Sequence, residues 1–553
     1  MGNRKKGKDP RRTSRREFFR TATRVGPGSL ALYFLSASRR GGGIEVVSSG
    51  NEAPKATLLV DAAALQHRIN PQVYGTFIEH FGRCIYGGVY EAGSPLSDEG
   101  GVRKDVMAAA REWGVPILRW PGGGFSSSYH WENGIGPQQT RPREFVAGWL
   151  EEESNQVGTD EFIRYCRMLG TEPYICVNLG TGTIEEAEHW VEYCNGTGNT
   201  YYANLRRKNG HPEPYNVRYW ELGNEIDLPW SPGSKGAEEY ARVAFECAKL
   251  MKWIDPTIRL VACGSEHPED GWNRIVLEKL IDLVDYISIH DYEGTDDYYE
   301  LLGSVRHFEE RLRLLDATIE LTAPLAGKDP ILALSLAGGQ KKKRIEIACD
   351  EWNIWYRKWD LMRRDVPNPL EERYNLRDAL WTASVLNLFH RMADKVTMAN
   401  ISMMVNVLGT MFTNEKGMFL QTIYFPMALY RYHCGSVMLG HRLDCPTFSS
   451  KSYKDLPFLD VSPTLDPEHR RIALAVVNRH RSAPITTSII VQNARVEKQA
   501  TVFEINGRDP DTENSFEHPD DVKITTRSYS RVGNTFEYAF PAHSVTLIDL
   551  TAG

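Results

Sequence analysis

Between Pro71 and about Gly440, short apolar runs alternate with stretches whose apolar residues recur at helical spacing. This alternation is typical of a parallel sheet wrapped by helices, which makes the chain α/β. The helical stretches include Gly101 to Trp113, Gly236 to Ile254 and Asn375 to Met392. Eight alternations favour a closed (β/α)8 TIM barrel over a doubly wound sheet. The eight predicted strands are Val73 to Phe81, Pro116 to Trp120, Pro173 to Leu179, Val217 to Leu222, Arg259 to Cys263, Asp285 to His290, Ile345 to Asp350 and Lys395 to Met404.

After Cys445 the pattern changes to short β-type runs separated by polar turns, which predicts a C-terminal β-sandwich of jelly-roll-like form. The run Ala56 to Asp61, before the barrel, is predicted to add a strand to that sandwich. The clearest β-type runs are Arg471 to Asn478, Thr486 to Gln492, Ala500 to Ile505 and Ser544 to Leu550. The predicted organisation is a leader over 1–40, a linker over 41–55, a strand region over 56–70, the barrel over 71–440 and the sandwich over 441–553.

Composition supports a large globular protein. The chain has 553 residues, of which 41% are hydrophobic and 25% charged, enough to bury the core of one large and one smaller domain. Its formal charge is −7, although the first forty residues are crowded with Arg and Lys, so the remainder is acidic and a nucleic-acid partner is disfavoured. Nine cysteines without a Cys-x-x-Cys argue against a disulfide scaffold and a zinc site, and we expect no metal.

The basic head of the chain has the order of an export signal. Ser14 to Arg20 contains an Arg pair followed by a Phe pair, and a modest apolar stretch runs from Val25 to Ala37. We therefore expect a twin-arginine signal and an exported, periplasmic or extracellular protein, with a disordered basic arm as the alternative. The apolar stretch is too short to span a bilayer well, so no membrane anchor is expected.

Two glutamates occupy matching places at strand ends. Glu225 follows the fourth predicted strand and Glu351 lies just beyond the seventh. In a barrel these ends face the substrate, and a retaining glycosidase needs one carboxyl group to protonate the leaving oxygen and another to attack the anomeric carbon. A single glutamate more often forms a salt bridge or lies on the solvated surface, so the hypothesis depends on their shared placement.

Other polar side chains are predicted at the same rim. An Arg near a carboxylate would keep that group ionised, whereas an apolar or anionic neighbourhood would keep the other carboxyl protonated. Tryptophan faces can stack on sugar rings, although such residues are at least as often core packing. The rim residues are Glu79, His80, Arg119, Asn178, Asn224, His290 and Tyr292, and the tryptophans are Trp120, Trp131, Trp352 and Trp355.

Five ordered motifs make the chain resemble glycoside hydrolase family 51, the α-L-arabinofuranosidases, from about Ala56 to the end. The motifs are Phe77 to Arg83, Tyr86 to Glu91, Leu118 to Gly123, Leu222 to Glu225 and Asp350 to Asn353. The resemblance implies that Glu225 is the general acid/base and Glu351 the nucleophile. It further implies that Glu79, Asn224 and Tyr292 line the arabinofuranose subsite, with Arg119 and His290 supporting the carboxylates.

The chain departs from the family pattern at two substrate-binding positions and at one neighbouring position. Gly124 stands where the family usually has an Asn, and Met403 where it usually has a Gln, so two hydrogen bonds to the sugar are lost, each worth about 1 kcal/mol. Glu221 stands where the family often has a small or thiol side chain, and it would raise the pKa of Glu225 if the two were close in space.

The resulting prediction is a retaining hydrolase that releases α-L-arabinofuranosyl residues from arabinoxylan, arabinan or their oligosaccharides without a cofactor. A homo-oligomer is expected from the resemblance alone. One alternative is a hydrolase of another glycoside, such as a galactofuranoside or β-glucan, because of Gly124 and Met403. Another is a non-catalytic carbohydrate-binding barrel, against which both glutamates argue.

Overall fold

The computed structural model describes residues 54–149, 151–327, 344–358 and 370–552. The predicted leader and residues 41–53 of the predicted linker lie outside these ranges. Within them, no helix combines the length and the apolar character that crossing a membrane requires.

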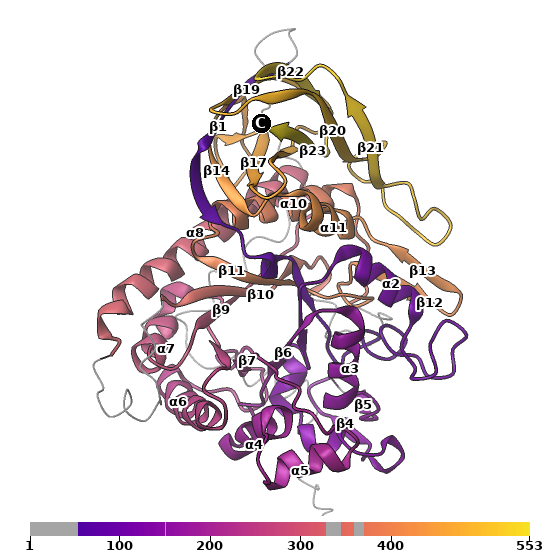
Figure 1. Cartoon of the computed structure of the whole chain (residues 1–553), viewed down its shortest axis with the longest axis vertical. Helices are drawn as coiled ribbons and strands as arrows, with labels where there is room; N and C mark the ends of the chain where they lie inside the picture. Colours follow the sequence, from indigo (N-terminus) through magenta and orange to yellow (C-terminus); the bar gives the residue numbers. More distant parts are fainter. Residues whose placement is uncertain (1–53, 150, 328–343, 359–369, 553) are drawn as a thin grey trace, which may run out of the picture. The chain divides into compact units, whose positions relative to one another are not determined.

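Eight parallel strands close into a barrel, which confirms the predicted fold and all eight predicted strands (Figure 1). Around the barrel the strand order is β10, β11, β2, β3, β6, β7, β8 and β9. Their bounds are β2 Gly75–Phe77, β3 Ile117–Trp120, β6 Glu172–Cys176, β7 Tyr219–Leu222, β8 Arg259–Ala262, β9 Tyr286–Glu293, β10 Glu346–Ile354 and β11 Val396–Ile401.

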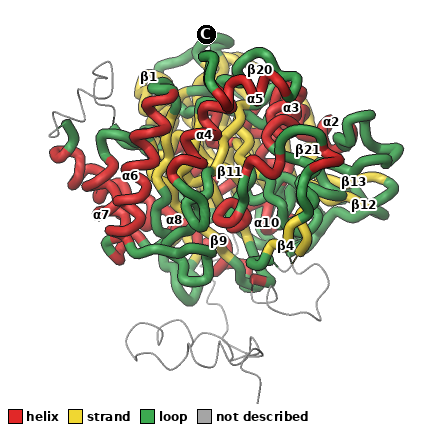
Figure 2. Tube along the Cα trace, turned by 90° about the horizontal axis from the view of Figure 1, so that it is seen from below, coloured by secondary structure: helices red, strands yellow, loops and turns green. Residues whose placement is uncertain are grey.

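Helices cover the outside of the barrel, and Figure 2 shows them flanking the strands. The α-helices are α2 Lys104–Trp113, α3 Thr159–Leu169, α4 Ile184–Asn195, α5 Tyr201–Lys208, α6 Ala237–Ile254, α7 Trp272–Leu280, α8 Tyr298–Thr322, α10 Leu376–Arg391 and α11 Tyr424–His433. Short 3-10 helices are η1 Pro71–Tyr74, η2 Gly124–Ser128, η3 Trp131–Gly134, η4 Gln138–Thr140, η5 Pro268–Asp270 and η6 Ala323–Leu325. Small hairpins are formed by β4 Glu144–Val146 with β5 Glu151–Glu153, β12 Met411–Asn414 with β13 Gly417–Leu420, and β15 Thr447–Phe448 with β16 Leu456–Pro457.

The barrel interior has an apolar layer below a polar one. The apolar layer is a separate buried cluster with one side chain from each of seven strands. In a strand, the side chains of residues i and i+2 point to the same side of the sheet, and residue i+2 lies nearer the C-terminal end of the strand. From Ile117, Tyr219 and Ala348 this step leads to Arg119, Glu221 and Asp350, all fully buried. The polar groups therefore lie toward the barrel end at which active sites form. The apolar cluster is Ile117, Tyr174, Tyr219, Val261, Tyr286, Ala348 and Met398.

The C-terminal domain is a nine-stranded sheet that includes β1, as predicted for the run before the barrel. β1 pairs parallel with β19 and antiparallel with β14. The edge strands β21 and β22 are at opposite ends of the sheet, yet the rings of Tyr529 and Tyr538 lie 5.3 Å apart, so the sheet curls until its edges meet. The order is β21 Lys523–Tyr529, β20 Val496–Asn506, β23 Ser544–Ala552, β18 Arg471–Asn478, β17 Leu459–Asp466, β14 Val437–Asp444, β1 Lys55–Arg68, β19 Ile485–Gln492 and β22 Thr535–Phe540.

Helix α10 joins the barrel to this sheet. Its N-terminus is capped by the Asn375 side chain, which accepts from the Arg377 amide, while Asp378 accepts from the Asn375 amide. Near its C-terminus, Arg391 donates to Asp460 of β17 at 2.7 Å. A helix packed between two domains needs apolar residues on several faces, which explains why nearly all of α10 is buried.

Candidate active site

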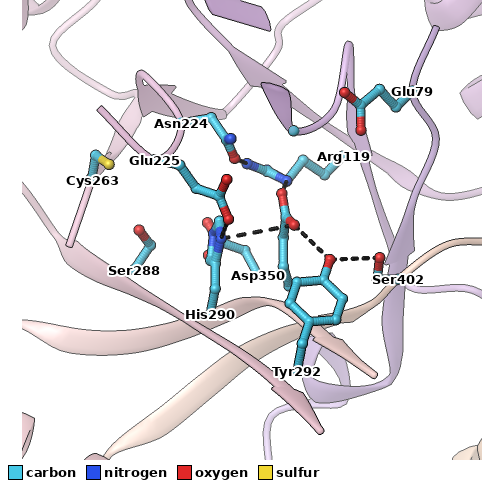
Figure 3. Close-up of polar contacts among 12 residues, drawn as sticks. Glu79, Arg119, Asn224, Glu225, Cys263, Ser288, His290, Tyr292, Asp350 and Ser402 are labelled. Carbon is cyan, nitrogen blue, oxygen red and sulfur yellow. Dashed lines mark hydrogen bonds and ion pairs between the residues drawn. The ribbon is translucent and has the colours of Figure 1, made fainter. Parts of the chain in front are cut away.

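Arg119 on β3 is the centre of a buried polar network. Its Nε and Nη2 donate to the two carboxylate oxygens of Glu221 at 2.6 and 3.1 Å. Nη1 donates to Glu351 Oε1 at 2.8 Å, and Nη2 also donates to Asn224 Oδ1 at 2.6 Å. Figure 3 shows Arg119 directed at Asn224 in the middle of the group. One planar guanidinium thus fixes Glu221 and Asn224, from β7 and the turn after it, together with Glu351 of β10.

Glu351 lies on β10, beside His290 of β9 in the strand register. In addition to Arg119, its carboxylate accepts from the Tyr292 hydroxyl, which lies 2.6 Å from Oε2. The same hydroxyl lies 2.7 Å from Ser402 Oγ, and Figure 3 shows this chain of contacts. Donors on both carboxylate oxygens hold Glu351 in one orientation.

Glu225 follows β7 in a left-handed backbone conformation, with φ of 46°. His290 Nδ1 lies 2.9 Å from Glu225 Oε1 and 3.8 Å from Glu351 Oε2. Carboxylate oxygens of Glu225 and Glu351 lie within 4.8 Å of each other. About a quarter of the Glu225 side chain is exposed, compared with 6% of Glu351. The two carboxyl groups therefore face one space, and Glu225 is the more accessible.

The electrostatic environment shifts the pKa values of Glu225, His290 and Asp350 in different directions. Burial raises the pKa of Glu225 to about 7, and the charge of Glu351 adds to this effect, while His290 opposes it. Burial lowers the pKa of His290, but Glu351, Asp350 and Glu225 outweigh burial and raise the pKa well above its usual value. Burial would raise the pKa of Asp350, yet its contacts with His290 and Arg119 lower it. Near neutral pH the site therefore combines a charged imidazolium with a protonatable Glu225.

Glu221 is an ion-pair partner of Arg119. It is fully buried and paired with Arg119 through both oxygens, and the raised pKa of Glu225 comes from burial and Glu351. Burial raises the pKa of Glu221 itself to about 7, with Arg119 opposing that rise. Its structural effect is to orient the guanidinium that holds Glu351 and Asn224.

Glu79 reaches the same space from the loop after β2. Its Oε1 accepts from the Phe125 amide at 2.8 Å, and burial followed by the charge of Glu351 raises its pKa to about 8. A Cβ atom on Gly123 would lie 2.9 Å from Glu351 Oε1 and 3.0 Å from Glu79 Oε2. The absence of a side chain at Gly123 is what lets the backbone pass between the two carboxyl groups.

Gly124 lies against a residue that the sequence reasoning missed. A Cβ on Gly124 would lie 2.8 Å from Cζ2 of Trp149, whose indole stacks on Phe81 with ring centroids 3.9 Å apart. Trp149 comes from the β4/β5 hairpin, where no strand or helix periodicity draws attention to it. Its position shows that the space vacated at Gly124 is taken up by an aromatic wall beside the Glu79 loop.

Strand eight contributes through Ser402 rather than through its neighbour. Met403 is buried in the apolar core, whereas Ser402 Oγ touches the Tyr292 hydroxyl. Two other predicted rim residues serve as supports: Asn178 donates to the Tyr129 carbonyl, and His80 contacts Glu153 at 2.7 Å. Of the four predicted tryptophans, Trp120, Trp131 and Trp352 are core residues, and Trp355 lies 5.5 Å from the Tyr292 ring.

Among the residues that the structure describes, two groups of side chains have the donor atoms that a metal ion would require. Glu221, His290 and Asp350 form one, and Glu225, His290 and Glu351 form the other, each with ligand atoms within 4.8 Å. In both groups the central His290 is drawn toward protonation by the surrounding carboxylates. A protonated imidazole has no lone pair for a metal, so this environment favours ion pairing over metal binding.

Comparisons with known proteins agree with this geometry. Residues 110–310 match the model of the α-L-arabinofuranosidase 1 domain, and residues 350–544 that of the α-L-arabinofuranosidase C-terminal domain. Alpha-L-arabinofuranosidase C of Emericella nidulans is 38% identical over 519 residues, covering 90% of this chain and 98% of that protein. An intracellular exo-α-(1→5)-L-arabinofuranosidase of Halalkalibacterium halodurans is 37% identical over 77% of this chain and 85% of its own length.

Solved structures lead to the same family. The arabinose complex of the Thermotoga maritima α-L-arabinofuranosidase has a TM-score of 0.82 and 41% identity, covering 90% of this chain and 99% of that one. The family 51 enzyme of Thermotoga petrophila has a TM-score of 0.81 at 41% identity, with coverage of 90% and 100%. Identity at this level across nearly the whole of each relative extends from the barrel into the C-terminal sheet, and the chain therefore belongs to glycoside hydrolase family 51, the α-L-arabinofuranosidases.

Proposed function

We propose that this protein is a retaining α-L-arabinofuranosidase with Glu351 as nucleophile and Glu225 as general acid/base. The observation that carries the proposal is the pair of carboxyl groups whose oxygens lie within 4.8 Å. Retaining glycosidases keep these groups about 5 to 5.5 Å apart, whereas inverting enzymes need about 6.5 to 9.5 Å to admit a water. The contrasting surroundings of the two groups support the division of roles.

In the first step, Glu351 attacks the anomeric carbon, and the bond from that carbon to the glycosidic oxygen breaks. The leaving oxygen takes the proton of Glu225, whose pKa of about 7 keeps it largely protonated in mildly acidic solution. Arg119 and Tyr292 hold the attacking carboxylate in place through both of its oxygens. The products of this step are the free aglycone and a glycosyl ester on Glu351.

In the second step, Glu225 must act as a base. Esterification removes the negative charge of Glu351, which is one cause of the raised pKa of Glu225. The pKa of Glu225 therefore falls in the intermediate, and its carboxylate can take a proton from the incoming water. The water oxygen bonds to the anomeric carbon as the ester bond to Glu351 breaks, and two inversions at this carbon give retention.

The sugar subsite is proposed to lie between Asn224, Glu79 and Trp149. Asn224 Nδ2 is buried without a hydrogen-bond partner among the described residues, and such a donor suits a sugar hydroxyl. Glu79, with a pKa of about 8, is protonated at neutral pH and can both donate to and accept from hydroxyls. The Trp149 indole supplies the apolar face on which a sugar ring packs.

The proposed substrates carry terminal α-L-arabinofuranosyl groups, such as arabinoxylan, arabinan and their oligosaccharides. The H. halodurans relative, named for exo cleavage of α-(1→5) linkages, supports arabinan-derived oligosaccharides. The second candidate, hydrolysis of another glycoside, is favoured by Gly124 and by the burial of Met403 in the apolar core, since neither provides a polar contact to the sugar.

The test measures hydrolysis of 4-nitrophenyl α-L-arabinofuranoside by the full-length chain beside a panel of aryl glycosides. Release of arabinose by the wild type and its loss in Glu351→Ala, with proton NMR showing the α-anomer first, would support the proposal. Turnover of a different glycoside that is also lost in Glu351→Ala would keep the mechanism and replace the substrate. Binding of arabinan oligosaccharides without turnover of any substrate would favour the carbohydrate-binding alternative.

We also propose that the protein is exported through the twin-arginine route, on the basis of Ser14 to Arg20. That route carries folded proteins, which suits the buried free thiols of the barrel, such as Cys176 and Cys263. Replacing Arg15 and Arg16 together by Lys should retain the protein inside the cell. Unchanged secretion of that variant would contradict the proposal.

A further inference from the structure

The β4/β5 hairpin that carries Trp149 is held down by a buried carboxylate outside the network around Arg119. Glu153, at the end of β5, is 5% exposed and accepts hydrogen bonds on both oxygens. His80 Nδ1 lies 2.7 Å from Oε2, and the Tyr86 hydroxyl and the Asn155 amide each donate to Oε1 at 2.5 Å. His80 and Tyr86 lie in the loop after β2 and Asn155 follows β5, so one anion joins two separate segments.

The tautomer of His80 is fixed by its other neighbour. The Trp120 indole Nε1 donates to His80 Nε2 at 3.0 Å, and an indole nitrogen can only donate. Nε2 is therefore an acceptor, which places the proton on Nδ1 and directs it at Glu153. Burial would raise the pKa of Glu153, but His80, Tyr86 and Asn155 more than offset it and lower the pKa. Glu153 is thus a buried anion with three donors.

His80 connects this carboxylate to the sugar subsite through its chain neighbours. Glu79 precedes it and faces the Gly123 backbone, while Phe81 follows it and stacks on Trp149. On the hairpin side, only three residues separate Trp149 from Glu153. The hydrogen bond between His80 and Glu153 therefore holds together the two segments whose aromatic rings form the wall over Gly124.

We propose that Glu153 is a positioning residue for this family's reaction, acting through Trp149, which it holds against Phe81 and Gly124 as a wall of the sugar subsite. The inference rests on the proposed function for the identity of the sugar, and on the contacts above for the mechanical connection. It predicts that Glu153 affects how well the sugar is held more than how fast the glycosidic bond breaks, because the nucleophile and its donors lie on other strands.

The test compares Glu153→Gln with Glu152→Gln. Glu152 is the adjacent residue of the same hairpin, and its side chain forms an exposed pair with Arg143 at 2.8 Å. In Glu153→Gln an amide N–H₂ must face one of the three donors, so the hairpin loses its fixed position. We expect KM for the aryl arabinofuranoside to rise about tenfold with a smaller change in kcat, and Glu152→Gln to match the wild type.

A double-mutant cycle separates positioning from general damage. If Glu153 acts through Trp149, Glu153→Gln should change KM little in a Trp149→Ala background. Additive effects, or wild-type kinetics for Glu153→Gln, would overturn the inference. A chain inactive on every arabinofuranoside would instead refute the proposed function. In that case hydrogen exchange still tests whether Glu153 holds the hairpin. If it does, amide protection across 144–158 is lost in Glu153→Gln and kept in Glu152→Gln.

Discussion

The pKa of Glu225 should depend on the charge of Glu351, and Glu351→Gln tests this directly. The substitution keeps the size of the side chain and removes its negative charge. At 4.8 Å, the outer limit of the separation of their oxygens, the repulsion between two carboxylates is about 3.5 kcal/mol at an effective dielectric constant of about 20. This corresponds to about 2.5 pKa units.

The pKa of Glu225 should shift by less than about 2.5 units in Glu351→Gln. Burial is the largest cause of the raised pKa of Glu225 and remains in the variant, while His290, which lies 2.9 Å from Glu225, continues to lower it. Removing one anion also weakens the hold on the His290 proton, although Asp350 still pairs with it at 3.3 Å. We therefore expect the pKa of Glu225 to fall from about 7 by roughly one to two units.

The measurement is an infrared or ¹³C NMR titration of the Glu225 carboxyl in the wild type and in Glu351→Gln. In the wild type, kcat/KM should fall tenfold per pH unit above about 7, because the reaction begins with protonated Glu225. An unchanged or raised pKa in the variant would refute the reasoning. Glu225 would then have to be governed by burial alone, and it could not alternate between acid and base by the route proposed above.

Three further substitutions test particular side-chain contacts. Gly124→Ala places a Cβ 2.8 Å from the Trp149 ring, so we expect KM to rise at least several-fold in steady-state assays, with little change in the melting temperature. Arg119→Lys cannot reach Glu221, Glu351 and Asn224 at once, and kcat/KM should fall by at least about a hundredfold; a loss below tenfold would contradict this. Asp460→Asn leaves Arg391 without its buried anion and should reduce the free energy of unfolding by about 3 to 5 kcal/mol in urea titrations.

The barrel could be predicted because its strands and helices have different periodicities, and all eight strands were found. Their ends were less predictable. β9 continues to Glu293 and β10 to Ile354, beyond the predicted ends at His290 and Asp350. These extensions hold polar residues that still pair in register, Asn353 with Tyr292 for example, because they line the site. In the C-terminal sheet, β14, β17, β21 and β22 were not predicted. For β21 the reason is that its residues are mostly exposed and show no apolar alternation.

Site residues at the ends of barrel strands could be predicted from the sequence. Site residues that a long loop brings to the barrel could not. Glu225, Glu351 and Arg119 each lie at or near the C-terminal end of a barrel strand, so the barrel itself brings them together. Trp149 and Glu153 come from a small hairpin in the connection after β3, whose path is set by contacts with distant segments. Motif spacing carries no information about such contacts.

A surplus of carboxyl groups connects the fold to the proposed chemistry. Five of them surround two cationic side chains in a region that is mostly closed to water, and such a cluster cannot hold all of its negative charges. The pKa of Asp350 is lowered beside His290, so Asp350 retains its charge. The pKa of Glu221 rises to about 7 and that of Glu79 to about 8. The five carboxyl groups are Glu79, Glu221, Glu225, Asp350 and Glu351, and the cations are Arg119 and His290.

The location of the exchangeable proton then follows from exposure. Glu221 is fully buried, and Glu79 is 3% exposed and fixed by the Phe125 amide, whereas Glu225 keeps about a quarter of its side chain exposed. Of these three raised carboxyl groups, Glu225 is the one that can exchange its proton with an entering substrate or water. The left-handed turn that places Glu225 at the edge of the cluster is therefore what suits it to the proposed role of acid/base.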